Sequence, residues 1–224
     1  MRSTIALIRK IMGIGSVHSR KPITVTTLLA TVLLGFATLS IAQAQVPDCA
    51  PGKLSDYEKL NAAGCLIGDK QFLNFQYHQG IGGLPSDAIS LTPGTTPSTN
   101  DPAILFEGKW ASAASDSYMS YMVATTYKGR PINGASLEMQ LGQITGAGNA
   151  SVIADLCAAD GADVNCGAQK VELQVVLSAD GKRKATDTAH FQQPQTEVRV
   201  TTPVNVVPGK GGDVELDGFM TVFQ

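Results

Sequence analysis

The chain has 224 residues, of which 43% are hydrophobic and 16% are charged, and its formal net charge is −2 at pH 7. The roughly 180 residues that follow residue 44 are enough for one domain with a substantial core and somewhat short for two. The acidic balance disfavours a polyanionic partner such as nucleic acid.

The N-terminal segment has the pattern of a secretory signal peptide. Its five basic residues precede an apolar run, Ile23–Ile41, and the sequence Ala42-Gln43-Ala44 is a signal-peptidase pattern. We therefore expect residues 1–44 to be removed by cleavage after Ala44, in a secreted or periplasmic protein. The alternative is an uncleaved membrane anchor, because the apolar run approaches the roughly 20 residues that span a bilayer. Translation from Met12 would shorten the long basic region.

Processing would make the chain more acidic. Twelve basic residues would remain against 19 acidic ones, a net charge of −7. The one basic cluster left, Lys182-Arg183-Lys184, follows Asp180-Gly181, a pair typical of hairpin turns, so we interpret it as a solvated turn.

Four cysteines follow residue 44, an even number in an exported chain. Three disulfide connectivities are possible. We favour two local pairs, Cys49 with Cys65 and Cys157 with Cys166, because each closes a short polar segment. A thiolate metal site is disfavoured, since no C-x₂-C spacing with a nearby histidine occurs.

Residues 45–70 are predicted to form a helical segment fastened by the first disulfide. Ser55 and Glu58 have the spacing of a capping box, which indicates one or two turns of helix. The strand period then begins, with Leu73, Phe75 and Tyr77 alternating with polar residues.

Residues 71–224 are predicted to form an all-β domain, an antiparallel β-sandwich of jelly-roll type with about ten strands. An open barrel is the alternative. Glycines and prolines place loops at residues 79–85 and 92–102. The strands are expected at residues 88–92, 104–110, 118–127, 137–141, 150–157, 171–177, 185–191, 198–206 and 214–223, with Met119, Tyr121, Val123 and Tyr127 on one face.

Two of these strands carry further expectations. The strand 171–177 is predicted to turn at Asp180-Gly181 and run back to Phe191 as a hairpin. The terminal strand, Val214 to Phe223, is a candidate for self-association by completing the sheet of a neighbouring copy.

Catalytic motifs are missing from the sequence after residue 44. There is no G-x-S-x-G or H-E-x-x-H, and His78 and His190 stand at expected strand ends, where exposed histidines are ordinary. Carboxylate catalysis requires two acids that converge in space. The glutamates in expected strands are explained by alternating polar faces, and no residue is assigned a catalytic or cofactor-binding role.

Two weaker binding patterns remain. Asp155, Asp160 and Asp163 cluster near the second cysteine pair and suit calcium, but the EF-hand order is absent, which favours a solvated acidic loop. Aromatic rings can stack on sugars, although the position of these rings in expected strands favours a role in filling the core. The candidate rings for a carbohydrate site are Trp110, Tyr118, Tyr121 and Tyr127.

The segment after the leader resembles the start of secreted bacterial β-rich proteins that often end in a PEP-CTERM sorting tail. The residues that carry this resemblance are Cys49, Leu54, Tyr57, residues 64–69, Phe72, Phe75 and Tyr77. It implies an exopolysaccharide-associated or surface protein and supplies no catalytic residues. No Pro-Glu-Pro motif with an apolar helix and arginine cluster follows Gln224, so attachment by that route is not expected.

Taken with the acidic charge and the cysteines, these patterns favour a non-enzymatic secreted or envelope protein that acts by interaction. Its expected partners are an envelope protein or an extracellular polysaccharide. A carbohydrate-binding module is the alternative, and a glycan-acting enzyme is a third hypothesis.

Overall fold

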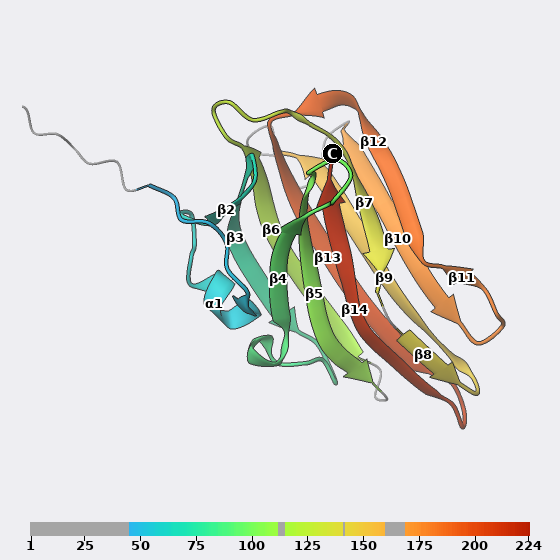
Figure 1. Cartoon of the computed structure of the whole chain (residues 1–224). Coiled ribbons are helices and arrows are strands. Elements are labelled where there is room, and N and C mark those ends of the chain that lie inside the picture. Colours follow the sequence, from blue (N-terminus) through green and yellow to red (C-terminus); the bar gives the residue numbers. More distant parts are fainter. Residues whose placement is uncertain (1–44, 112–114, 141, 160–168) are drawn as a thin grey trace, which may run out of the picture. The chain divides into compact units, whose positions relative to one another are not determined.

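The computed structural model describes residues 45–111, 115–140, 142–159 and 169–224, and these form one compact unit (Figure 1). Its helices are α1 (Leu54–Glu58) and the 3₁₀ turn η1 (Ser86–Ala88). Its strands are β1 (Gly52–Lys53), β2 (Cys65–Ile67), β3 (Lys70–Gln79), β4 (Ser90–Thr95), β5 (Pro102–Ala111), β6 (Ser115–Thr125), β7 (Ile132–Met139), β8 (Gly142–Thr145), β9 (Gly148–Ala158), β10 (Lys170–Ser178), β11 (Arg183–Lys184), β12 (Thr186–Gln195), β13 (Glu197–Pro208) and β14 (Asp213–Phe223).

The strands form two antiparallel sheets with the connections of a jelly roll. Sheet A has the order β11-β10-β9-β13-β6-β3-β2. Sheet B has the order β1-β4-β5-β14-β7-β12, and β8 pairs with β14. Eight strands, taken as β5-β14-β7-β12 and β10-β9-β13-β6, have the order produced by two interlocked Greek keys. The predicted jelly-roll sandwich is confirmed, and the short strands β1, β2, β8 and β11 raise the number above the ten expected.

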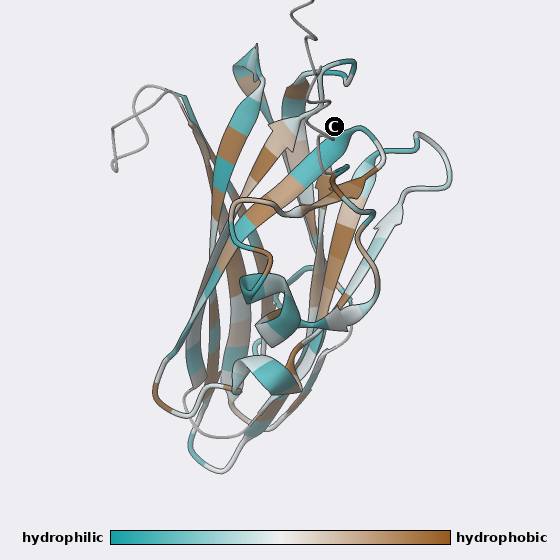
Figure 2. Ribbon diagram, turned by 90° about the vertical axis from the view of Figure 1, so that its left-hand side faces the viewer, coloured by the Kyte–Doolittle hydropathy of each residue, from teal (hydrophilic) through white to brown (hydrophobic). Residues whose placement is uncertain are grey.

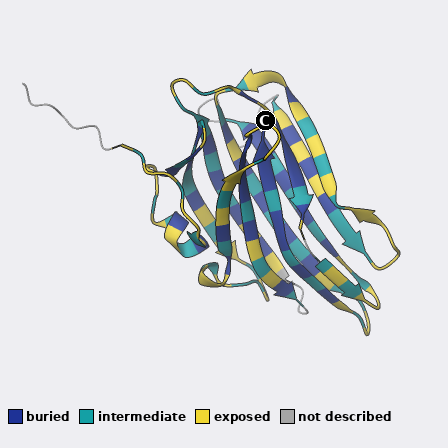
Figure 3. Ribbon diagram, in the orientation of Figure 1, coloured by how far each residue is buried: buried dark blue, intermediate teal, exposed yellow. Residues whose placement is uncertain are grey.

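Alternation along the strands places the core between the two sheets. In β13 the valines at 198, 200, 204 and 206 are fully buried, while Arg199 between them is exposed. Figures 2 and 3 show the same alternation of hydropathy and burial along most long strands. Since successive side chains point to opposite faces, one side of each sheet packs and the other meets solvent.

Tyr121 of β6 lies at the centre of an aromatic cluster that joins the sheets. Its ring stacks on Phe75 of β3, with ring centroids 5.2 Å apart. Across the sandwich it contacts Phe106 of β5 and Phe223 of β14, at centroid distances of 5.9 and 6.4 Å. Such offset and edge contacts add to the free energy gained by burying the rings.

The N-terminal helix forms, but the predicted capping box is wrong. Helix α1 begins at Leu54, and the Asp56 carboxylate accepts a hydrogen bond from the Lys53 amide at 3.4 Å. Glu58 instead accepts from the backbone amide of Tyr77, at 3.0 Å. Because Glu58 contacts β3, it does not cap the helix, whose N-cap is Lys53, two residues before the predicted Ser55.

The hairpin predicted around Asp180-Gly181 is right only near the turn. Strand β10 pairs with β11 through Val176–Lys184 and Leu177–Arg183, and the chain then crosses to sheet B. There β12 pairs with β7 rather than with β10. The Asp187 carboxylate accepts from the Gln174 amide at 2.8 Å, which occupies a donor on the edge of β10.

The terminal strand β14 is not an edge strand. It pairs with β5 on one side and with β7 and β8 on the other. Both of its hydrogen-bonding edges are therefore occupied within the same molecule. Self-association by this strand would require sheet B to open, which corrects the expectation from sequence.

Candidate functional site

A hollow of about 470 Å³ opens on the outer face of sheet A, over three neighbouring strands. Strands β3, β6 and β13 supply its walls, and most of the side chains that it exposes are polar. The lining residues are Asn74, Gln76, Tyr118, Ser120, Tyr121, Met122 and Arg199. Small-ligand sites are concave and combine aromatic side chains with convergent polar groups, and this hollow is more polar than most of them.

A β-bulge in β3 shapes one wall of this hollow. The register with β6 shifts between Leu73 and Gln76, and Asn74 has a left-handed φ of 54°. Asparagine tolerates this conformation better than most residues. The extra residue places Phe72 and Phe75 in the core and Gln76 outside, so the predicted sharing of one face by Leu73 and Phe75 is wrong.

The Tyr118 side chain is 43% exposed, although it lies in the middle of a sheet. Its register partners are His78 on β3 and Pro203 on β13. Neither neighbour covers the ring completely. A tyrosine presented in this way offers an apolar face together with a hydroxyl group, which is the combination that binds polar ligands with apolar surfaces.

The hollow also contains a cation, Arg199, that is unpaired among the described residues. Arg199 is exposed on β13, and its register partners Met122 and Cys157 are uncharged. Nearby on the same face, Lys170 forms ion pairs with Asp155 at 2.9 Å and with Glu172 at 3.1 Å. Within the part of the chain that the structure describes, the side chains of Gln76, Tyr118, Ser120 and Arg199 make no hydrogen bond or ion pair.

The structure separates the four rings proposed for a carbohydrate site. Trp110 and Tyr121 are 0% and 1% exposed, and both pack within the aromatic core. Tyr127 is fully exposed but lies in the turn after β6, not on its inner face as expected. Of the four rings, only Tyr118 is both exposed and part of the hollow.

The other predicted groups do not form a ligand site among the described residues. Asp155 is paired with Lys170, and Asp160 and Asp163 lie outside the described residues. No group of three or more potential metal ligands occurs in residues 45–111, 115–140, 142–159 and 169–224. His78 and His190 are both exposed on strands.

One predicted disulfide is confirmed. Cys49 and Cys65 are bonded, with their Cα atoms 4.8 Å apart, and they join the segment before α1 to β2. Cys157 is also disulfide-bonded, and its expected partner Cys166 lies outside the described residues.

A second hollow, of about 250 Å³, lies beside the Cys49–Cys65 disulfide. It is bordered by the chain from Pro47 to Gly52 and by Tyr57, whose hydroxyl donates to the carbonyl of Ala50 at 2.7 Å. That hydrogen bond occupies the main polar group of the wall. Burial raises the pKa of Tyr57 to about 12, so the hydroxyl remains a donor at neutral pH.

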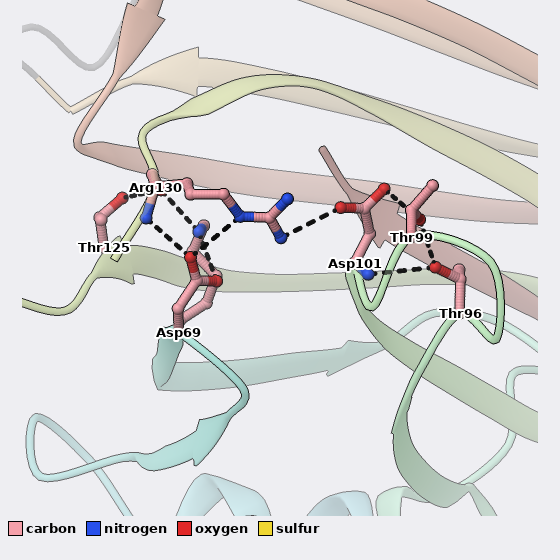
Figure 4. A network of polar contacts seen from close by, with 7 residues as sticks. Asp69, Thr96, Thr99, Asp101, Thr125 and Arg130 are labelled. Atoms are coloured by element: carbon pink, nitrogen blue, oxygen red, sulfur yellow. Dashed lines mark hydrogen bonds and ion pairs between the residues drawn. The ribbon is translucent and has the colours of Figure 1, made fainter. Parts of the chain in front are cut away.

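A polar network links loops from both sheets at one end of the sandwich (Figure 4). The ammonium of Lys70, which is 1% exposed, donates to Asp69 at 2.7 Å and to the carbonyl of Arg130 at 2.6 Å. The Arg130 guanidinium lies 3.5 Å from Asp69 and 3.3 Å from Asp101. Thr99 donates to Asp101 at 2.6 Å. Because these groups satisfy one another, the network joins loops and leaves few groups for a ligand.

Two carboxylates meet on sheet B. Burial and a hydrogen bond with Glu215 raise the pKa of Asp217, while Lys109, which lies 3.4 Å from Glu215, opposes that rise. Asp217 is at a bulge, since the register with β5 shifts between Leu216 and Gly218.

Sequence reasoning missed Asn74, Gln76, Ser120 and Arg199 as parts of one hollow. Their shared signal is a polar side chain on the strand face opposite the core. That signal becomes informative only when β3, β6 and β13 are known to be neighbours, and their pairing joins residues 38 to 91 positions apart.

Comparisons with known proteins give no sequence relative. No family model matches the chain, and the search of curated proteins finds no match. Among solved structures, TmCBM61 in complex with beta-1,4-galactotriose matches with a TM-score of 0.32 and 11% identity, over 67% of this chain and 88% of that one.

Two further solved structures are similar at the same level. The enzymatically active domain of bacteriophage CBA120 tailspike protein 4 matches with a TM-score of 0.29 and 10% identity, over 66% of this chain and 19% of that one. Endoglucanase 3 of Trichoderma harzianum, from family GH12, matches with a TM-score of 0.23 and 10% identity, over 67% of this chain and 98% of that one. Likeness this remote gives no basis for assigning a ligand or an activity. In the described residues, no helix is long and apolar enough to cross a membrane.

Proposed function

We propose that this protein is a non-enzymatic, exported β-sandwich that binds a polysaccharide in the hollow around Tyr118. The observation that carries the proposal is the exposed Tyr118 ring in the middle of sheet A, beside the open polar groups of Gln76, Ser120 and Arg199. The ring supplies a surface for the apolar face of a sugar, and the polar side chains supply hydrogen bonds to its hydroxyl groups.

Export is part of the proposal because of the leader sequence and the cysteines. Disulfides persist in oxidising compartments, and the Cys49–Cys65 bond fastens the segment that directly follows the expected cleavage point. A binding role outside the cytoplasm agrees with the absence of a catalytic motif in the sequence after residue 44.

The test is a binding screen of the purified protein against a glycan array that contains neutral and acidic polysaccharide fragments. The Tyr118→Ala variant should weaken binding of a glycan hit between about two- and tenfold, the usual contribution of an aromatic contact. Tyr127→Ala is the matched control, because Tyr127 is fully exposed in a turn and is not part of the hollow. It should bind as the wild type does.

Two results would sink the proposal. One is the absence of binding to every glycan on the array. The other is binding that survives Tyr118→Ala and is lost in Tyr127→Ala. Trp110→Ala is unsuitable as a binding control, because removing this buried ring costs about 3–5 kcal/mol of stability by itself.

A further inference from the structure

Arg199 is a charged donor in the hollow that has no partner within the described protein. It lies on the outer face of β13, exposed, between the uncharged register partners Met122 and Cys157. A guanidinium has five donors in a planar fork that matches a carboxylate. The polar wall of the hollow therefore includes an unused site for an anion.

The acidic residues around Arg199 that the structure describes form no ion pair with it. Asp155, on the adjacent strand, and Glu172 are both ion-paired with Lys170. Glu197 lies two residues away on the same face of β13 and forms no ion pair with Arg199 among the described residues. A ligand carboxylate would thus meet a cation that no side chain of the described residues occupies.

From this geometry we infer that the hollow selects oligosaccharides that carry carboxylate groups, as uronic acids do. The inference rests on the proposed function and specifies its ligand class. Charge-assisted bidentate hydrogen bonds to a carboxylate are about twice as strong as neutral ones. The chain is acidic on average, so an anionic ligand gains nothing from the long-range field and depends on this local contact.

The positions of Tyr118 and Arg199 set a minimum size for the ligand. Arg199 is in register with Met122, and Met122 follows Tyr118 by four residues on β6. At a rise of ~3.3 Å per residue, the two positions are about 13 Å apart along the sheet. This separation exceeds one sugar ring, so a ligand that contacts both residues has at least two or three sugar units.

The deciding experiment compares uronate trisaccharides with their methyl esters by titration calorimetry. Galacturonate, glucuronate and mannuronate trisaccharides form the panel, and esterification removes the charge while keeping the rings. The wild type should bind at least one acid about tenfold more tightly than its ester. Arg199→Gln should abolish this preference, so that the acid and its ester bind to the variant with equal affinity.

Two matched variants distinguish the effect of the planar Arg199 guanidinium from the effect of the protein's net charge. Arg183→Gln removes the same charge from β11, at the far edge of sheet A, and should keep the acid preference. Arg199→Lys keeps the charge but loses the planar fork, so the preference should shrink to an intermediate value.

The outcomes distinguish the two proposals. Equal binding of acid and ester, or a preference retained by Arg199→Gln, overturns the carboxylate inference and leaves glycan binding standing. No binding of any acid or ester, together with an empty glycan array, overturns both. Tighter binding of a sulfated, carboxyl-free galactan than of the uronates would mean that the anion is a sulfate ester, and it would also overturn the inference.

Discussion

Lys70 donates from its buried ammonium group to the backbone carbonyl of Arg130, 2.6 Å away and 60 residues later in the chain. The same ammonium donates to Asp69 at 2.7 Å. These bonds connect the start of β3 to the loop before β7, so one buried cation joins a strand of sheet A to an entry into sheet B.

Replacing Lys70 with methionine should destabilise the protein by roughly 2–4 kcal/mol, because it leaves Asp69 and the Arg130 carbonyl without their main donor. Lys59→Met is the control, since the Lys59–Asp56 pair is 73% and 60% exposed and should change stability by less than about 0.5 kcal/mol. Urea unfolding measures both. Equal stability of Lys70→Met and wild type would show that the cost of burying the ammonium offsets its hydrogen bonds.

Asp69 makes stability sensitive to acid. Burial opposes its ionisation, but hydrogen bonds from Lys70 and from the Arg130 amide outweigh burial and lower the pKa of Asp69. A carboxyl group with a lowered folded pKa stabilises the fold above its unfolded pKa of about 4, and the contribution is lost as the pH falls through the folded pKa. The stability difference between wild type and Asp69→Asn should be full at pH 7 and shrink below about pH 4. A difference independent of pH would contradict this assignment.

The ionised carboxylate of Asp217 should destabilise the fold, in contrast to that of Asp69. Burial and Glu215 raise the pKa of Asp217, so its ionised form disfavours the fold at neutral pH. Asp217→Asn should increase stability at pH 7 by a few tenths of a kcal/mol, and the gain should vanish in acid, where both states are protonated. Urea midpoints measured between pH 3 and 7 would show the trend. A loss of stability at pH 7 would mean that the carboxylate has a favourable partner.

Gly64 and Gly181 form a matched pair of positions for measuring how much an added Cβ destabilises the fold. Both have positive φ, 57° and 81°. A Cβ at Gly64 would collide with the Phe72 carbonyl and lie 2.8 Å from the Leu73 Cβ, whereas none of the protein lies within 4 Å of a Cβ at Gly181. Gly181→Ala should therefore cost about 1 kcal/mol from conformation alone, and Gly64→Ala roughly 1–3 kcal/mol more from the clash. Similar losses in the two variants would argue against this crowding.

Breaking the Cys49–Cys65 bond should mainly affect the N-terminal segment. The bond closes a loop across a sequence separation of 16, for which the chain-entropy model gives about 3 kcal/mol. The double variant Cys49→Ser/Cys65→Ser should unfold at lower temperature in calorimetry. Hydrogen exchange should rise first at the Leu66 amide, which donates to the Pro47 carbonyl. An unchanged melting temperature would show that α1 and β2 hold their places through packing alone.

Local alternation was enough to predict the fold class. Val198 and Val200 alternate with polar residues, and both valines are buried. The parity of positions also places Tyr118 and Tyr121 on opposite faces of one strand. Residue type alone does not distinguish the four candidate rings, and two of them belong to the core.

The remaining features depend on contacts between distant residues. The bulge at Asn74 reverses the face of Leu73, and nothing in the short run Leu73-Asn74-Phe75 marks an inserted residue. The strand after Asp180-Gly181 has the same alternation whether it returns to β10 or crosses to β7, so periodicity alone could not choose between them. The site shares this difficulty, because Arg199 and Tyr118 come to line the same hollow only through the pairing of β13 with β6.

The central place of β14 has a consequence for biosynthesis. Strands β5 and β7 emerge from the ribosome long before residues 213–223, yet these residues are the ones that lie between them. Sheet B therefore cannot close during most of translation, and long-range pairings of this kind form slowly. For the exported protein that we propose, this delay would keep sheet B open until the last strand has been synthesised.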